Sequence, residues 1–132
     1  MRTEDLEARI RRTKRLNAGM VDENAAVPLA EYINKLLDER NVKRSKLIRA
    51  LNMDRNYGYQ ILNGTRHPSR VQIIKIGLYL MLSVEEVQRM LTLGERHVLY
   101  VRRMEDAKIY HCLEHKTPYN DACQFIWGDE EE

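Results

Sequence analysis

The chain has little of what builds disulfide-bonded, membrane-spanning or low-complexity proteins. Only two of its 132 residues are cysteines, Cys112 and Cys123, too few for a disulfide framework. Its six glycines and three prolines are scattered, so no flexible or proline-rich linker is visible. No apolar run approaches the roughly 20 residues that cross a bilayer, and residues 1–16 are too charged for a signal peptide. We therefore expect a cytoplasmic protein with reduced thiols.

Motifs of catalysis and of metal binding are also missing. The sequence has no glycine-rich phosphate loop, no HExxH and no nucleophile motif. His111, Cys112, His115 and Cys123 are metal-ligand types, but no CxxC or other paired ligand spacing accompanies them. Cys123 also falls on an apolar stripe, where cysteine behaves as a small hydrophobic residue. We expect neither an enzyme nor a bound metal or cofactor.

What the chain does have is positive charge concentrated in its middle. The formal net charge is only +2, yet residues 40–70 contain eight basic residues and one acid, Asp54, a net +7. Residues 93–132 contain five basic and nine acidic residues, a net −4. A basic block inside a near-neutral chain is the electrostatic footprint of a protein that binds a polyanion.

Residues 41–69 predict two short helices joined by a tight turn. Leu47, Ile48 and Leu51 form one apolar face of the first helix. Asp54 is a good N-cap for a second helix at about 55–62, because its carboxylate accepts from free N–H groups. Asn63 and Gly64 end that helix, since both tolerate positive φ.

The second helix separates its side chains into two sets. Gly58 and Ile61 are expected to face inward. The outward positions hold side chains that can bond base edges and phosphates: Arg55, Asn56, Tyr59 and Gln60.

The remaining chain predicts further helices, which makes the fold all-α. An N-terminal helix at 3–16 has a thin apolar face, so it docks either loosely on its own chain or on a partner. A linker at 17–27 is followed by a core helix that begins at Pro28 and ends near Asn41. Helices capped by Ser69 and Ser83 complete a bundle that ends at Gly94. Helices at 99–115 and, after a Thr117 cap, up to Gly128 form an appended hairpin before an acidic tail. The predicted parts are 1–27, 28–94 and 95–132.

The stretch from Asn41 to Ser69 resembles, without a gap, the helix-turn-helix of the lambda-repressor-like (Cro/CI-type, xenobiotic response element) family. At nine positions the family carries, in order, Leu, Ala, Leu, Val, Ile or Leu, Gly, a basic residue, Pro and Ser. At these positions this chain has Leu47, Ile48, Leu51, Met53, Ile61, Gly64, Arg66, Pro68 and Ser69. The segment RNYGYQILNGTRHPSR and the C-terminal extension resemble those of a subgroup of this family from Gram-positive bacteria.

The resemblance implies a five-helix DNA-binding bundle and a transcriptional regulator, expected to be a repressor. By position, the expected base-reading residues are Arg55, Asn56 and Gln60, with Tyr59 on the same exposed side. The expected phosphate contacts are Lys43, Arg44, Lys46, Arg66 and Arg70. Double-stranded DNA is the implied partner. A protein-interaction module, such as an antitoxin or adaptor, remains the alternative.

Two residues depart from the family pattern. Lys43 stands where the family has a Thr or Ser cap, so the first helix lacks its ordinary cap unless Asn41 serves. Gly58 stands where the family buries Val or Ile, and it either allows close packing or leaves the helix mobile.

We also expect a homodimer, because two half-sites raise affinity for DNA. The hairpin at 99–127 is the first choice of interface and residues 3–16 the second. The reason is that Tyr119, Ile126 and Trp127 offer more apolar surface than one short hairpin can bury.

Overall fold

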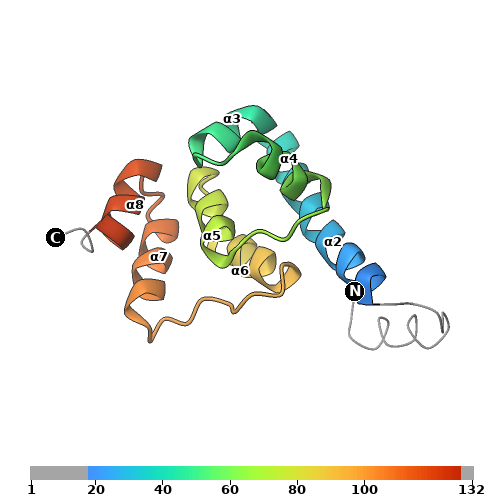
Figure 1. The fold of residues 1–132 in the computed structure, drawn as a ribbon. Coiled ribbons are helices and arrows are strands. Elements are labelled where there is room, and N and C mark those ends of the chain that lie inside the picture. The colour runs from blue at the N-terminus through green and yellow to red at the C-terminus, as the bar shows by residue number, and fades with distance from the viewer. Residues whose placement is uncertain (1–17, 129–132) are drawn as a thin grey trace.

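The computed structural model describes residues 18–128, and within that range the chain is all-helical, with seven helices and no strand (Figure 1). None of these helices is both long and apolar enough to cross a membrane. The seven helices, in chain order, are α2 (Ala18–Glu39), α3 (Arg44–Ala50), α4 (Arg55–Asn63), α5 (Arg70–Tyr79), α6 (Val84–Leu93), α7 (Met104–Glu114) and α8 (Tyr119–Trp127).

The predicted linker at 17–27 and the predicted helix start at Pro28 are wrong, because α2 runs from Ala18 through Pro28 to Glu39. A proline inside a helix removes one N–H donor and is costly. Packing offsets that cost: Ala26 is buried, and a Cβ built on Gly64 would lie 3.2 Å from the Val27 Cα. The expected boundary between residues 27 and 28 therefore falls inside a helix. The helix predicted at 3–16 lies outside the described residues.

Helices α2 to α6 pack into a bundle around one apolar core. The inward stripes expected from the sequence are buried, with Ile33, Leu37, Leu47, Ile73 and Val87 all fully inaccessible. The residues at these positions recur every three to four residues, so each helix turns one apolar face to the centre.

The predicted caps of α4, α5 and α6 are confirmed. The Asp54 carboxylate accepts from the Tyr57 backbone N–H at 3.1 Å, and Gly64 ends α4 with φ of 83°. Ser69 and Ser83 both form capping boxes, in which the residue three positions later bonds back to the cap. Lys43 makes no side-chain capping bond, so α3 begins without one.

Gly58 is a close-contact site between α4 and α3. A Cβ placed on it would lie 2.7–2.9 Å from three side-chain atoms of Ile48. Ile48 occupies the position where the resembled family has Ala, and Gly58 the position where it has Val or Ile. In this chain the bulk at the contact comes from Ile48 on α3 and not from α4.

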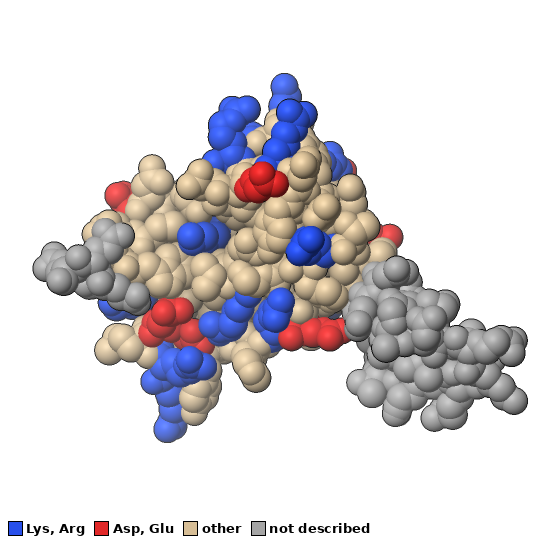
Figure 2. Space-filling model, in the orientation of Figure 1, with Lys and Arg blue, Asp and Glu red and all other residues tan. Residues whose placement is uncertain are grey.

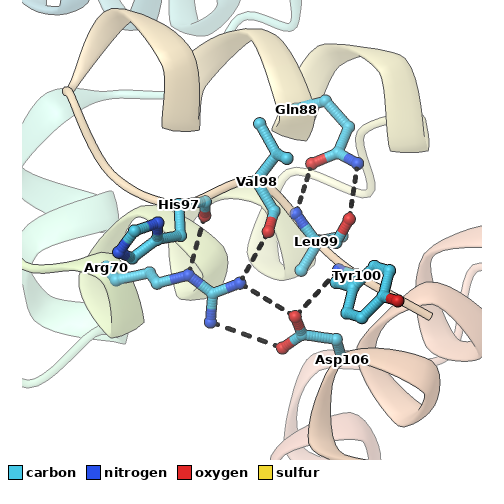
Figure 3. A network of polar contacts seen from close by, with 7 residues as sticks. All are labelled: Arg70, Gln88, His97, Val98, Leu99, Tyr100 and Asp106. Atoms are coloured by element: carbon cyan, nitrogen blue, oxygen red, sulfur yellow. Dashed lines mark hydrogen bonds and ion pairs between the residues drawn. The ribbon is translucent and has the colours of Figure 1, made fainter. Parts of the chain in front are cut away.

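The helix predicted at 99–115 is shorter than expected, since α7 spans only Met104–Glu114 and the preceding residues are not helical. Side chains hold the backbone of this segment instead, as Figure 3 shows. Gln88 bonds both the N–H and the C=O of Leu99, at 2.7 and 3.2 Å. Asp106 accepts from the Tyr100 N–H at 2.9 Å. These contacts join residues six and eleven positions apart, which the three-to-four-residue periodicity of a helix does not reveal.

The hairpin of α7 and α8 packs on α5 of the same chain. Ala122 and Ile126 are buried, and the Tyr119 ring meets the Tyr79 ring edge-on at 5.6 Å. Pro118, rather than the predicted Thr117, occupies the N-cap of α8. The expectation that Ile126 remains available for a partner is therefore wrong, because α5 covers this stripe.

Candidate nucleic-acid interface

Helices α3 and α4 present a basic surface. Lys and Arg side chains gather at the top of Figure 2, where α3 lies in Figure 1. Asp54 is the one acid of the sequence between residues 40 and 70, and its carboxylate caps α4. The exposed members of this surface are Lys43, Arg44, Lys46, Arg49, Arg55 and Arg66. The charge concentrated in the sequence is therefore also concentrated in space.

The outward set predicted on α4 lies on one side of the helix. Arg55, Asn56 and Gln60 are exposed, while Gly58 and Ile61 on the opposite side are buried. Tyr59 differs from the other three, because its ring is partly buried and packs against the core. The Arg55 guanidinium carbon lies 5.9 Å from the Tyr59 ring centroid. Tyr59 thus supports Arg55 by a cation–π contact.

Gln60 and Arg66, predicted as separate contacts, are joined. The Arg66 Nε donates to the Gln60 Oε1 at 2.8 Å, and the Arg66 guanidinium carbon lies 5.2 Å from the Tyr57 ring centroid. The Tyr57 hydroxyl donates to the Gln72 Oε1 at 3.0 Å. The Gln60 amide is therefore held with its N–H₂ group free to donate outward.

Arg44 lies on the same surface but is tied to α2. Its Nε donates to the Asn34 Oδ1 at 2.7 Å, and its NH2 lies 3.8 Å from the Asp38 carboxylate. Asn34 also donates to the carbonyls of Ala30 and Leu62 at 2.8 and 2.9 Å. Arg44 is thus pre-positioned at the start of α3, with part of its charge compensated.

Arg70 does not join the basic surface. Its side chain is only 22% exposed, and its NH2 is 3.1 Å from Asp106, which is 1% exposed (Figure 3). It also donates to the carbonyls of His97 and Val98, at 2.8 and 3.2 Å. The two Asp106 oxygens and the two carbonyls satisfy most of the guanidinium, so Arg70 joins α5 to α7 rather than facing a polyanion.

Arg49 is the residue that the sequence analysis did not select. It is exposed on the last turn of α3 and lines a cleft of about 370 Å³ together with Arg55 and Tyr59. A signal was present in the sequence, because Arg49 is one of the eight basic residues between positions 40 and 70. We therefore include Arg49 in the candidate interface and leave Arg70 out.

The histidine, cysteine and acidic side chains of the described residues form no comparable site. Among residues 18–128, no group of three or more His, Cys, Asp or Glu side chains could hold a metal ion. Burial raises the pKa of the Cys112 thiol and of the Tyr119 hydroxyl, so both remain neutral near pH 7. No family model, curated protein or solved structure matches this chain.

Proposed function

We propose that this chain is a sequence-specific double-stranded DNA-binding regulator of transcription, with α2 to α6 as a lambda-repressor-like bundle. The proposal rests on one observation, the different side chains on the two sides of α4. Its inner side is buried against α3 and the core, and its outer side holds exposed guanidinium and amide groups. A recognition helix needs this division, because it must be held rigidly while it reads base edges.

In this proposal α4 enters the major groove and α3 crosses the backbone. Arg55 can bond guanine O6 and N7, and Asn56 and Gln60 can bond adenine N6 and N7. The phosphate contacts are Lys43, Arg44, Lys46, Arg49 and Arg66, which surround α4 on the exposed surface. Phosphate contacts fix the register of the protein on DNA and base contacts select the sequence.

We further propose a homodimer that acts as a repressor on two half-sites. Four exposed large apolar side chains fall within seven residues on the segment before and at the start of α7: Val98, Tyr100, Val101 and Met104. Met104 is 73% exposed, the highest value among the large apolar residues of the described chain. This apolar strip replaces Ile126 as the reason to place the interface in the C-terminal part.

The same apolar strip also supports the second candidate function, a protein-interaction module. Salt distinguishes the two functions. Binding to DNA through several phosphates weakens steeply as salt rises, whereas an apolar interface does not. A salt-independent interaction with a protein, and no binding to any duplex at low salt, would favour the interaction module.

The test is selection of bound sequences from a random duplex pool, followed by affinity measurements at several salt concentrations. We expect one enriched sequence class. Lys46→Ala should weaken binding and lower the salt slope by about one ion, since Lys46 is in the proposed phosphate set. Lys35→Ala is the matched control, because Lys35 is equally exposed but lies on α2. Failure to enrich any sequence while Lys46→Ala and Lys35→Ala behave alike would contradict the proposal.

A further inference from the structure

A cleft opens between α3 and the start of α4. Its volume is about 370 Å³, within the range of small-ligand sites. Its lining combines three kinds of side chain, two arginines, two hydroxyls and two apolar groups: Arg49, Arg55, Ser45, Tyr59, Ile48 and Met53.

The two arginines bring two positive charges to the cleft. Both are exposed, and none of the ion pairs among residues 18–128 includes either of them. Arg55 is held over the Tyr59 ring, with 5.9 Å between its guanidinium carbon and the ring centroid. A guanidinium that is already oriented loses less entropy when it binds an anion.

The floor of the cleft is apolar. Ile48 is buried and Met53 is partly buried, so both are fixed by the core beneath them. The absence of a side chain at Gly58 allows Ile48 to fill the space beside α4, as the contacts of 2.7–2.9 Å to a Cβ built there show. A charged ligand that also carries a carbon body would cover this floor and remove it from water.

We propose that this cleft binds a phosphate ester, with the phosphate between Arg49 and Arg55 and the attached carbon group on Ile48 and Met53. Two guanidinium groups match a phosphate better than a carboxylate, because a phosphate offers more acceptor oxygens and up to two negative charges. The hydroxyls of Ser45 and Tyr59 line the same cleft and can donate to phosphate oxygens.

Two sources share this chemistry: a free phosphate monoester and the sugar-phosphate backbone of DNA. The second source rests on the proposed function, in which α3 crosses the backbone, and it would place Arg55 on a phosphate instead of a base edge. The first source does not rest on the proposed function. A free ester would also compete with DNA, because Arg55 belongs both to the cleft and to the proposed base-reading set.

The first arm of the experiment uses phenyl phosphate, with inorganic phosphate and phenol for comparison, at constant ionic strength. Amide NMR shifts of the full chain report binding. We expect phenyl phosphate to shift Ser45, Arg49 and Tyr59, and to bind at least about tenfold tighter than either comparison compound. Arg49→Gln should weaken it about tenfold or more. Arg89→Gln is the matched control, because Arg89 also lies over a tyrosine ring but outside the cleft.

The second arm identifies the source with duplex DNA. If the backbone occupies the cleft, Arg49→Gln weakens preferred and scrambled duplexes alike and lowers the salt slope by about one ion. If a free phosphate ester occupies the cleft, Arg49→Gln leaves the affinity for duplex DNA within about twofold of that of the unmodified chain. Phenyl phosphate then displaces DNA from the unmodified chain. Either result supports the cleft site.

Phenyl phosphate that binds no tighter than inorganic phosphate, or that binds Arg49→Gln as well as the unmodified chain, would overturn the proposal. A chain that binds phenyl phosphate in this way but binds no duplex would instead overturn the proposed function alone. The proposed cleft site and the proposed function can therefore be contradicted independently of each other.

Discussion

Ile48 and Gly58 meet where α3 approaches α4, and this contact sets the position of the candidate recognition helix. The structure favours close packing over mobility as the reason for the glycine, because three Ile48 atoms occupy the space of a Cβ. The side chain of Ile48 fills the space that a side chain at position 58 would need. A sequence comparison of one position at a time would treat both residues as defects.

Gly58→Ala should therefore destabilise the chain, although alanine is the better helix former. We expect a loss of about 1–3 kcal/mol in the free energy of unfolding, as for an overpacked core. Chemical denaturation measures it. Ile48→Ala removes all three crowding atoms and should itself cost about 2–5 kcal/mol.

The control is the double variant. Once Ile48 is alanine, adding Gly58→Ala should cost nothing, or stabilise by up to about 1 kcal/mol through helix propensity. A higher unfolding midpoint for Gly58→Ala alone would show that the close approach is not required.

Gln60 and Arg66 give the second prediction at the residue scale. Gln60→Ala should cost about 1–3 kcal/mol on the preferred duplex and relax preference at one or two base positions. Arg66→Ala should weaken preferred and scrambled duplexes together and lower the salt slope by about one ion. Because Arg66 donates to the Gln60 Oε1 at 2.8 Å, its removal should also reduce preference slightly.

Binding of each variant to both duplexes at several salt concentrations tests these roles. Arg55→Ala should resemble Gln60→Ala if Arg55 reads a base, and Arg66→Ala if the DNA backbone occupies the cleft between Arg49 and Arg55. If Gln60→Ala and Arg66→Ala instead gave equal losses on both duplexes with equal slope changes, the division into base and phosphate contacts would be wrong.

At the scale of elements, a polar joint between Arg70 and Asp106 helps to hold the hairpin of α7 and α8 on the bundle. Asp106 is the buried charged residue of the described core, and Arg70 from the first turn of α5 bonds both of its carboxylate oxygens, at 3.4 and 3.1 Å. No buried side-chain nitrogen or oxygen in the described part of the chain lacks a hydrogen-bond partner. The joint is thus fully satisfied as long as both residues are present.

Arg70→Ala should leave the Asp106 carboxylate buried without its partner. We expect a loss of about 3–5 kcal/mol in the free energy of unfolding, together with faster amide exchange at residues 97–101. Denaturation and hydrogen exchange measure the two effects. Arg40→Ala is the matched control: its pair with Glu86 is about 30% exposed on both sides, so its loss should cost at most about 1 kcal/mol. Equal costs for the two variants would contradict the role of the joint.

At the scale of the whole molecule, the basic surface and the apolar strip belong to different elements. The first lies on α3 and α4, and the second on the segment that leads into α7. This separation allows DNA and a second copy to bind without sharing residues. The proposed dimer is therefore testable without touching the proposed DNA contacts.

Tyr100→Ser combined with Met104→Gln should weaken self-association about tenfold or more while the fold is kept, because both side chains are already exposed. Sedimentation of the full chain measures the oligomeric state. Phe125→Ser is the control, since Phe125 is 47% exposed but lies on α8 outside the strip. An unchanged oligomeric state in the double variant would exclude the strip as the interface.

The sequence by itself determined the features that repeat over short distances. Apolar spacing gave the inward faces of α3 to α6, and Asp54, Ser69, Ser83 and Gly64 marked helix ends that the structure confirms. These signals are local, because a helix face repeats within four residues and a cap bonds within three. For the same reason the charge block and the outward side of α4 were visible before any fold was known.

Only the tertiary structure decided which of these side chains are available to contact another molecule. Arg70 was predicted as a phosphate contact, and it became a buried joint because Asp106, 36 residues later, folds against it. Before Met104, Gln88 and Asp106 bond the backbone of Leu99 and Tyr100 where the sequence predicted a helix. These partners lie 6 to 36 residues apart in the chain, beyond the three-to-four-residue spacing that a local helical pattern records.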